Sequence, residues 1–550
     1  MKLGCRLAAS LVLLAAFARA EAQIEPRLAV IHARVITMSD SGAEAEAMVI
    51  EGERIIYAGQ SAQAQKICGP QCWILDLNGL TVVPGFNDNH THTTEGGLFY
   101  SRPSLAGKSC EEIAGMIGKE VKKTAAGEFV FGHDWDYGSC PNPNRPALDK
   151  VSPENPVMLT QYGGHSVWVN SLFLAQLKIT ADTPDPKGGK IDRDEKGEPT
   201  GILRESAAEM AYERQLLGLS MGQRRKAIAK ALELYRAAGI TSVQDNTWDP
   251  RNVWVLSDLK KQGKLTCRFT CWPVGERWYG KTLARAAIYS PGWIRPGPVK
   301  FYADGAFSNK SAWMTRPYAD EPSNSGFPRR SQAELDKIIL GEAGNNRQVA
   351  VHAIGDRAVQ SVLDAIEAAE KNFPAAKDLR MRLEHVQMVR PEDLPRFEEL
   401  GALASLHPFA LCDPDKDVRI LGKDRAKQAY PYQSLLKAGA RISFGSDFPA
   451  EVDYQPLLGI YYAVTRKSKS GKSALNRGEA LSVKEALWAY TRGSAYAEFT
   501  EQDKGSLEVG KLADFVVLSK NPFELKPEKI KDIQVLYTFV GGRQVWPESQ

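Results

Sequence analysis

The chain has 550 residues and a formal net charge of +4, with 43% hydrophobic and 25% charged residues. This length is enough for two structural units with a large core. The net charge is small and the sequence contains no Lys/Arg block, so the composition indicates neither a nucleic-acid nor a membrane partner.

The first 22 residues have the layout of a secretory signal peptide. Lys2 and Arg6 flank the start of the apolar run Leu7–Phe17, and residues 18–20 or 20–22 fit an A-x-A cleavage site. A membrane anchor is the weaker alternative, because the run is far below the ~20 residues that a span needs. We therefore expect residues 1–22 to be removed and the mature protein to be soluble, periplasmic or secreted, without a membrane span.

The two ends of the mature chain are both rich in short strands. Residues 23–80 read as strands and turns, with a hairpin around Glu51-Gly52, and residues 501–550 repeat this style, with a hairpin at Gly541-Gly542. Because both ends are β-rich and the middle of the chain has another pattern, we predict one small β-sandwich built from both termini.

The middle, residues 81–500, alternates apolar strands with amphipathic helices, which predicts an α/β fold, a (β/α)8 TIM-like barrel. A doubly wound parallel sheet is the alternative, because strand order is not visible in a sequence. A stretch of about residues 95–220 between the first two strands is too long for a loop and predicts an inserted subdomain or a lid. The expected strands are 81–90, 240–245, 265–272, 299–304, 348–353, 381–386, 402–407 and 441–447, and the expected helices are 222–238, 252–262, 332–345, 357–371, 391–400 and 431–439.

Seven cysteines remain after the signal peptide, too few to be the framework of the fold. The turn residues inside Cys68-Gly-Pro-Gln-Cys72 favour a local disulfide in an oxidising compartment. Cys267 and Cys271 lie four residues apart in a β-rich run, about 13 Å from each other, which is too far for a bridge. A C-x-x-C zinc site is absent from the sequence.

Histidine is scarce, with eight residues in the whole chain, and its placement is the main functional signal. His90 and His92, two residues apart after an apolar run, point the same way on a strand. His352, His385 and Asp447 also close apolar strands, where a barrel keeps its active site. One buried histidine is more often a core residue, but this number of polar strand ends predicts a metal site.

The chemistry of such a site follows from its ligands. Neutral imidazoles bind a divalent ion, which lowers the pKa of its water to ~7, and a nearby carboxylate such as Asp447 can take the water proton. Lys300 lies in the middle of an apolar strand, where a bare ammonium is costly. Carbamylation by carbon dioxide would make it an anion that bridges two ions; alternatively it reaches solvent or pairs with Asp304.

The sequence resembles the amidohydrolase-3 branch of the amidohydrolase superfamily, which includes YtcJ-like proteins and N-substituted formamide deformylases. The matching segments cover nearly the whole mature chain in order. They are Val83-Pro-Gly-Phe-Asn-Asp-Asn-His-Thr-His, Gly164-His-Ser-Val-Trp-Val-Asn, Pro199-Thr-Gly-Ile-Leu-Arg-Glu, Val299-Lys-Phe-Tyr-Ala-Asp-Gly, Val351-His-Ala-Ile-Gly-Asp-Arg-Ala, Glu384-His, Gly445-Ser-Asp-Phe-Pro and Gly505-Ser-Leu-Glu-Val-Gly-Lys-Leu-Ala-Asp-Phe-Val-Val-Leu.

The resemblance implies the barrel-plus-sandwich fold and a role for each matching site residue. It implies that His90 and His92 bind a first metal, that Lys300 is the carboxylated bridge, and that Asp447 is the metal-bound general base. It implies further that a second metal is bound by His352 and His385.

One segment departs from the family pattern. Relatives often read Gln-Pro-x-His in strand seven, whereas this chain has His407 in the place of the glutamine and Ala410 in the place of the histidine. Substrate assignments therefore do not carry over from relatives. His133, His165 and His407 are expected to bind substrate or polarise its carbonyl, with ordinary loop hydrogen bonding as the alternative.

The sequence thus predicts a metal-dependent amidohydrolase that cleaves a non-peptide amide or related C–N bond of a small molecule. The cofactor is expected to be one or two divalent ions, with zinc favoured, and a homo-oligomer is left open. An ester or lactone hydrolase on the same site is the second enzyme hypothesis, and an exported binding protein without turnover is the third. No G-x-S-x-G occurs at a strand-to-helix turn, which disfavours a serine hydrolase.

Overall fold

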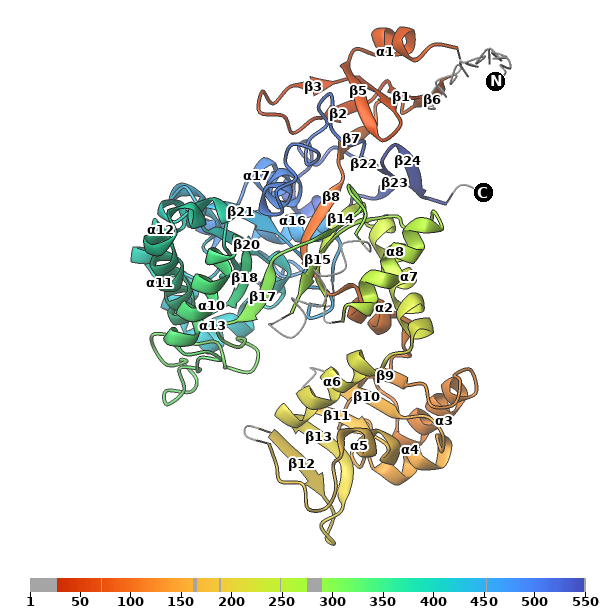
Figure 1. Ribbon diagram of the computed structural model, residues 1–550, viewed down its shortest axis with the longest axis vertical. Helices are drawn as coiled ribbons and strands as arrows, with labels where there is room; N and C mark the ends of the chain where they lie inside the picture. Colours follow the sequence, from red (N-terminus) through yellow and green to blue (C-terminus); the bar gives the residue numbers. More distant parts are fainter. Residues whose placement is uncertain are drawn as a thin grey trace, which may run out of the picture.

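The computed structural model describes residues 27–70, 72–161, 166–186, 189–247, 249–274, 289–451 and 453–548. The expected signal peptide lies outside these residues. Three groups of elements follow one another along the long axis: sheets from both termini, a central group of parallel strands with helices, and an inserted lobe (Figure 1). Among the described helices, none combines the length and the apolar character needed to cross a membrane.

Two sheets lie at the terminal end of the molecule, and the larger of them combines strands from both ends of the chain. The four-stranded sheet has the order β5-β4-β1-β6, and the six-stranded sheet has the order β24-β23-β22-β7-β2-β3. Side chains from both sheets, such as Met48 and Phe515, belong to one hydrophobic cluster. Their bounds are β1 Arg27–Ile31, β2 Arg34–Ile36, β3 Glu44–Ala45, β4 Ala47–Glu51, β5 Arg54–Gly59, β6 Trp73–Asp76, β7 Thr81–Pro84, β22 Phe515–Leu518, β23 Val535–Val540 and β24 Arg543–Trp546, with α1 at Ser61–Cys68.

Parallel strands form the centre of the molecule as two sheets, β16-β15-β14-β8 and β17-β18-β19-β20-β21. Isolated parallel bridges link the two sheets at both sides, Thr91 with Phe448 and Val274 with Lys300. The bounds are β8 Phe86–Thr91, β14 Ile240–Thr247, β15 Arg268–Pro273, β16 Ile294–Pro296, β17 Val299–Tyr302, β18 Val349–Ala353, β19 Arg382–His385, β20 Leu403–Leu406 and β21 Arg441–Phe444.

Helices cover these strands and share one large hydrophobic cluster with them, in which Val351 of β18 and Val362 of α11 are fully buried. Each such side chain contributes about 1.5–3 kcal/mol through burial. Ser331 and Glu334 form the capping box that starts α10, which adds roughly 1 kcal/mol. The helices are α2 Thr93–Ser101, α7 Met221–Ala237, α8 Arg251–Lys261, α10 Gln332–Gly344, α11 Asp356–Asn372, α12 Arg396–Glu399, α13 Pro414–Leu421, α14 Lys423–Ala426, α15 Tyr432–Lys437, α16 Pro456–Thr465, α17 Val483–Trp488 and α18 Ser494–Ala497.

The inserted segment folds around a five-stranded sheet of its own, in the order β12-β13-β11-β10-β9, so it is more than a loop (Figure 1). Its own hydrophobic clusters include Val167 and Trp168, both fully buried. The elements are α3 Cys110–Val121, β9 Val130–Trp135, α4 Arg145–Val151, β10 Val157–Gln161, β11 Ser166–Val169, α5 Ser171–Leu177, β12 Gly189–Arg193, β13 Pro199–Glu205 and α6 Ser206–Gly218.

Two of the expected elements differ from the structure. The apolar run 81–90 is two strands rather than one: β7 pairs with β2 and β22 of the terminal sheet, and β8 pairs with β14 of the parallel sheet. The break falls at Gly85, where a Cβ would clash with the side chain of Thr241. A continuous apolar run is compatible with a strand in either sheet, so the periodicity of the sequence does not show that the run is divided at Gly85. The expected helix 391–400 shrinks to α12, preceded by a 3-10 turn at Pro391–Asp393.

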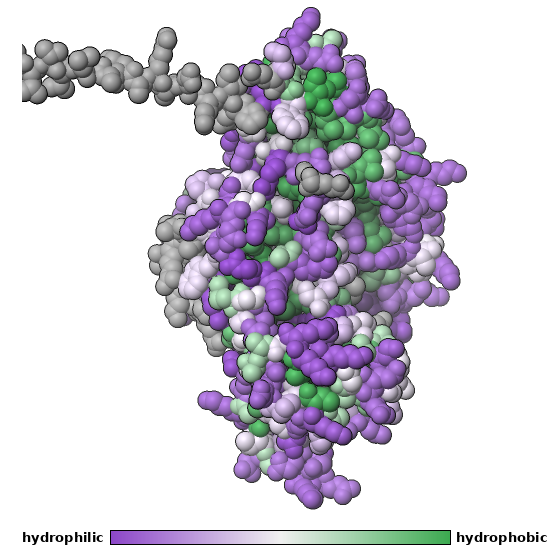
Figure 2. All heavy atoms as spheres, turned by 90° about the vertical axis from the view of Figure 1, so that its right-hand side faces the viewer, coloured by the Kyte–Doolittle hydropathy of each residue, from purple (hydrophilic) through white to green (hydrophobic). Residues whose placement is uncertain are grey.

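Two disulfides crosslink the described part of the chain. Cys68 and Cys72 are bridged as expected, and Cys110 pairs with Cys140 inside the lobe, which the sequence did not indicate. Cys267 and Cys271 are buried thiols, in line with the expectation that they cannot bridge. On the face in Figure 2 the surface is largely hydrophilic, and hydrophobic residues gather mainly towards its upper end.

Candidate metal centre

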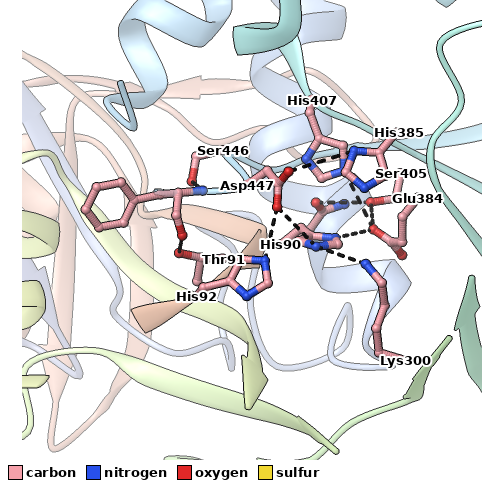
Figure 3. Close-up of polar contacts among 12 residues, drawn as sticks. His90, Thr91, His92, Lys300, Glu384, His385, Ser405, His407, Ser446 and Asp447 are labelled. Carbon is pink, nitrogen blue, oxygen red and sulfur yellow. Dashed lines mark hydrogen bonds and ion pairs between the residues drawn. The ribbon is translucent and has the colours of Figure 1, made fainter. Parts of the chain in front are cut away.

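The ends of β8 and β21 bring together three of the expected ligands. His92 Nε2 lies 3.2 Å from Asp447 Oδ1, and His90 Nε2 lies 3.4 Å from the same oxygen (Figure 3). The backbone holds this arrangement, because the Asp447 N–H donates to the His90 carbonyl at 2.8 Å and the His92 N–H donates to the Phe448 carbonyl at 2.8 Å. Asp447 adopts a left-handed backbone, with φ of 57°, which turns its carboxylate towards the two imidazoles.

A buried charge network sets the orientation of His90. Its Nδ1 donates to Glu384 Oε2 at 2.7 Å, and the same carboxylate accepts from Arg382 at 2.8 Å and from the Ser405 hydroxyl at 2.5 Å. With Nδ1 occupied, Nε2 is the free ring nitrogen, and it faces Asp447. Burial and the charge of Lys300 hold the pKa of His90 well below its usual value, so the imidazole is neutral, the form that binds metals.

Two groups of donor atoms in the described chain lie close enough to hold one ion, His90 with His92 and Asp447, and His90 with Glu384 and His407. The second group does not suit a cation, because the Arg382 guanidinium already neutralises Glu384. The first group fits a divalent ion: two imidazoles and one carboxylate converge from two strand ends. Burial alone would raise the pKa of Asp447, but the hydrogen bond from His92 and the neighbouring histidines together outweigh it, and the pKa is lowered overall.

Lys300 lies beside this group, almost completely buried in β17. Its Nζ is 3.2 Å from His90 Nε2. Burial lowers the pKa of Lys300 to about 8, against the opposing effects of the Glu384 and Asp447 carboxylates. Of the alternatives left open by the sequence, exposure to solvent is wrong. Asp304 is instead bound by backbone N–H groups, among them that of Gly355 at 2.8 Å.

His352 and His385 lie next to each other at the neighbouring strand ends. Their ring centroids are 4.2 Å apart, and His385 Nδ1 lies 3.9 Å from Asp447 Oδ2. His352 Nε2 donates to the Gly305 carbonyl at 2.9 Å, and neither ring belongs to the two donor groups above. Burial lowers the pKa of His352 to about 3, and it holds the pKa of His385 well below its usual value.

The three histidines expected at the substrate fall in different places. His407 is buried beside the proposed ligands: its ring centroid is 4.4 Å from that of His385, and Nε2 lies 3.8 Å from Glu384 Oε2. It does not line the cavity over the metal centre. His133 lies in β9 of the lobe, where Nδ1 contacts Asp134 at 2.8 Å, and it does not line the cavity over the metal centre. His165 lies outside the described residues.

A cavity of about 300 Å³ opens over these side chains, and its wall adds residues that the sequence reasoning missed. Lys416 and Glu451 both line it. Nothing in the local pattern marks either residue. The sequence analysis also missed the Arg382–Glu384 pair, although two charged residues at i and i+2 in an apolar strand share one face and could have indicated it.

Glu384→Gln should weaken metal binding by about 10- to 100-fold, because an amide oxygen is a weaker acceptor than a carboxylate and would hold the His90 tautomer and ring orientation less firmly. Metal affinity measured by competition with a chromophoric chelator is the test. Glu392→Gln, at an exposed surface carboxylate, is the matched control. Unchanged affinity in Glu384→Gln, at an unaltered melting temperature, would show that this carboxylate does not orient the ligand.

Comparison with known proteins places the chain among hydrolases. The model of the amidohydrolase family matches residues 74–546. The chain is 34% identical to Protein LONG AFTER FAR-RED 3 of Arabidopsis thaliana, over 94% of this chain and 91% of that protein. It is 28% identical to N-substituted formamide deformylase of Arthrobacter pascens, over 94% of this chain and 97% of the relative. A crystal structure of an uncharacterized metal-dependent hydrolase from Pyrococcus furiosus superposes with a TM-score of 0.78 at 29% identity, covering 90% of this chain and 100% of the other.

Proposed function

The chain belongs to the amidohydrolase family and is a metal-dependent hydrolase acting on C–N bonds, and from this premise we propose that it cleaves a non-peptide amide of a small molecule. The observation that carries the proposal is the convergence of His90, His92 and Asp447 at the wall of a cavity of about 300 Å³. A cavity of this size suits a small ligand.

We propose that His90, His92 and Asp447 hold one divalent ion, with zinc favoured by the imidazole ligands. Such an ion supplies a Lewis acid, which polarises a carbonyl and lowers the pKa of water to ~7. Lys300, His352 and His385 are the proposed ligands of a second ion. Reaction of the neutral Lys300 amine with carbon dioxide would give a carbamate and a proton, and the buried position of Lys300 beside His90 supports that bridging role.

Asp447 is the proposed general base. Its carboxylate takes a proton from water and delivers it to the leaving nitrogen, which would otherwise depart as a poor anion. The histidines beside it keep the carboxylate ionised, and its backbone hydrogen bond to His90 fixes its position. His407, whose ring nitrogens form no hydrogen bond among the described residues, is proposed to contact the substrate. His133 and His165 remain proposals for the same role.

The fold and location of the protein are part of the proposal. The bridges at both sides of the parallel sheets support a closed (β/α)8 barrel over about residues 81–500, with residues 23–80 and 501–550 forming a β-sandwich and residues 95–220 an inserted subdomain. The start of the chain supports export after cleavage near residue 22. Recovery of intact Met1 from exported protein would contradict that cleavage.

The experiment that tests the function is a screen of the metal-loaded protein against a library of small amides, in which each amide has an ester of the same scaffold beside it. We expect at least one amide to be hydrolysed with catalytic turnover, and N-substituted formamides are the first to try, since one relative is named for them. Turnover confined to the esters would favour the hypothesis of an ester or lactone hydrolase. Binding without turnover of either set would reject an enzyme.

A further inference from the structure

The wall of the cavity over the metal centre carries charged side chains besides the proposed metal ligands. Apart from the proposed ligands, the described residues that line it include one cation, Lys416, and one carboxyl, Glu451. The other described lining residues are uncharged, among them Ala410 and Gln387. These two charged groups therefore decide which small molecules the cavity favours.

The position of Lys416 is fixed by its helix. Lys416 lies in the first turn of α13, where its backbone N–H donates to the side chain of Asp413 at 3.1 Å. The next residue, Asp417, is buried and accepts from the Tyr430 hydroxyl at 2.9 Å. Tyr430 lines the cavity as well. The helix is thus anchored on both sides of Lys416, which holds the stem of its side chain at the wall.

Lys416 is half-buried, and its ammonium has no ion pair within the described part of the chain. Its charge acts on the Glu451 carboxyl, whose pKa is raised to about 7 by burial. A cation that loses water without gaining a partner is unfavourable, and a carboxylate from a ligand would supply a charge-assisted hydrogen bond. Glu451 lies in the turn that follows Asp447, since its backbone N–H donates to the Asp447 carbonyl at 3.4 Å. A carboxylate beside Glu451 would be repelled, so the favourable place for an anion in the cavity is against Lys416.

We propose, resting on the proposed function, that Lys416 makes this enzyme selective for amides that carry a carboxylate at the end away from the bond that is cleaved. The carbonyl of the amide lies at the metal centre, and the carboxylate lies against Lys416. Glu451 faces the stretch between them, where an uncharged N–H of the amide can donate to it. N-acylated amino acids have this arrangement of groups.

The test uses two probes of nearly the same shape, N-formyl-leucine and N-formyl-leucinamide, in which a carboxamide replaces the carboxylate. The metal-loaded wild type should prefer the acid in kcat/KM. Lys416→Met should reduce that preference by about 10- to 100-fold, the effect of one lost charge-assisted hydrogen bond. Lys416→Arg should keep most of it, because the charge remains. Lys423→Met, at an exposed lysine of the next helix, is the matched control and should not alter the preference.

Calorimetric binding of N-formyl-leucine to the same variants decides the question even if the formyl bond is cleaved too slowly to follow. Weaker binding to Lys416→Met than to Lys423→Met supports the inference. Equal binding, or a wild type that prefers the carboxamide, overturns it while the hydrolase function stands. Failure of the wild type to hydrolyse any amide in the screen would instead reject the proposed function, so the two failures are distinguishable.

Discussion

Removal of the metal is expected to abolish hydrolysis of any amide that the screen identifies, by at least about 1,000-fold, and a divalent ion should restore it. The ion stabilises the transition state by several kcal/mol, and each 1.4 kcal/mol corresponds to a factor of ten in rate. In this chain its removal also leaves Asp447 facing two imidazoles, with no electrophile for the carbonyl. Activity should be followed during dialysis against a chelator and then during titration with zinc, manganese and cobalt ions.

The control for this experiment is a measurement of whether the metal-free protein stays folded. Circular dichroism of the metal-free protein separates loss of the ion from unfolding, because metal binding is often coupled to folding. Elemental analysis of each sample fixes the ratio of metal to chain. Full activity in a folded sample that contains no metal would reject the mechanism built on His90, His92 and Asp447.

Replacement of Lys300 should have the second largest effect. Lys300→Ala is expected to lower the rate by about 100- to 1,000-fold and to lose about one ion per chain, because the proposed carbamate is the anionic oxygen ligand between two cations. Lys300→Arg should not substitute, since a guanidinium stays cationic and cannot carry a carbamate. Short carboxylic acids with bicarbonate should partly restore Lys300→Ala by supplying an oxygen ligand. Rate and metal content are measured on the same samples.

Lys264→Ala, at an exposed lysine, is the control for the loss of a lysine as such. A crystal structure of the native protein would show whether Nζ of Lys300 carries the extra carboxyl group. If Lys300→Ala keeps its rate and its metal, a site with one ion on His90, His92 and Asp447 explains the hydrolase, and Lys300 is structural.

The pattern of apolar strands was enough to predict where the chemistry lies. His90, His352 and His385 were predicted because each ends an apolar run, and the structure places all three at ends of parallel strands. Such runs are local: burial on both faces demands apolar residues, and a polar residue at the end marks the place where the strand leaves the core. The helices α7, α10 and α11 follow their predicted limits closely for the same reason, since their periodicity and caps are local.

The contacts that complete the site depend on residues far apart in the chain. His92 meets Asp447 across 355 positions, and Glu384 reaches His90 across 294. No local pattern encodes such pairs, because they exist only once the parallel strands are side by side.

By itself, the sequence determined the strand-end positions of the imidazoles, the family resemblance and the local Cys68–Cys72 bridge, all of which depend on short-range patterns. Only the tertiary structure decided that the apolar run at 81–90 serves two sheets, that Cys110 pairs with Cys140, and that Lys416 on α13 faces the cavity beside the metal centre. The physical reason is that each of these outcomes is settled by which distant surface a segment packs against, and that choice is made by the whole fold.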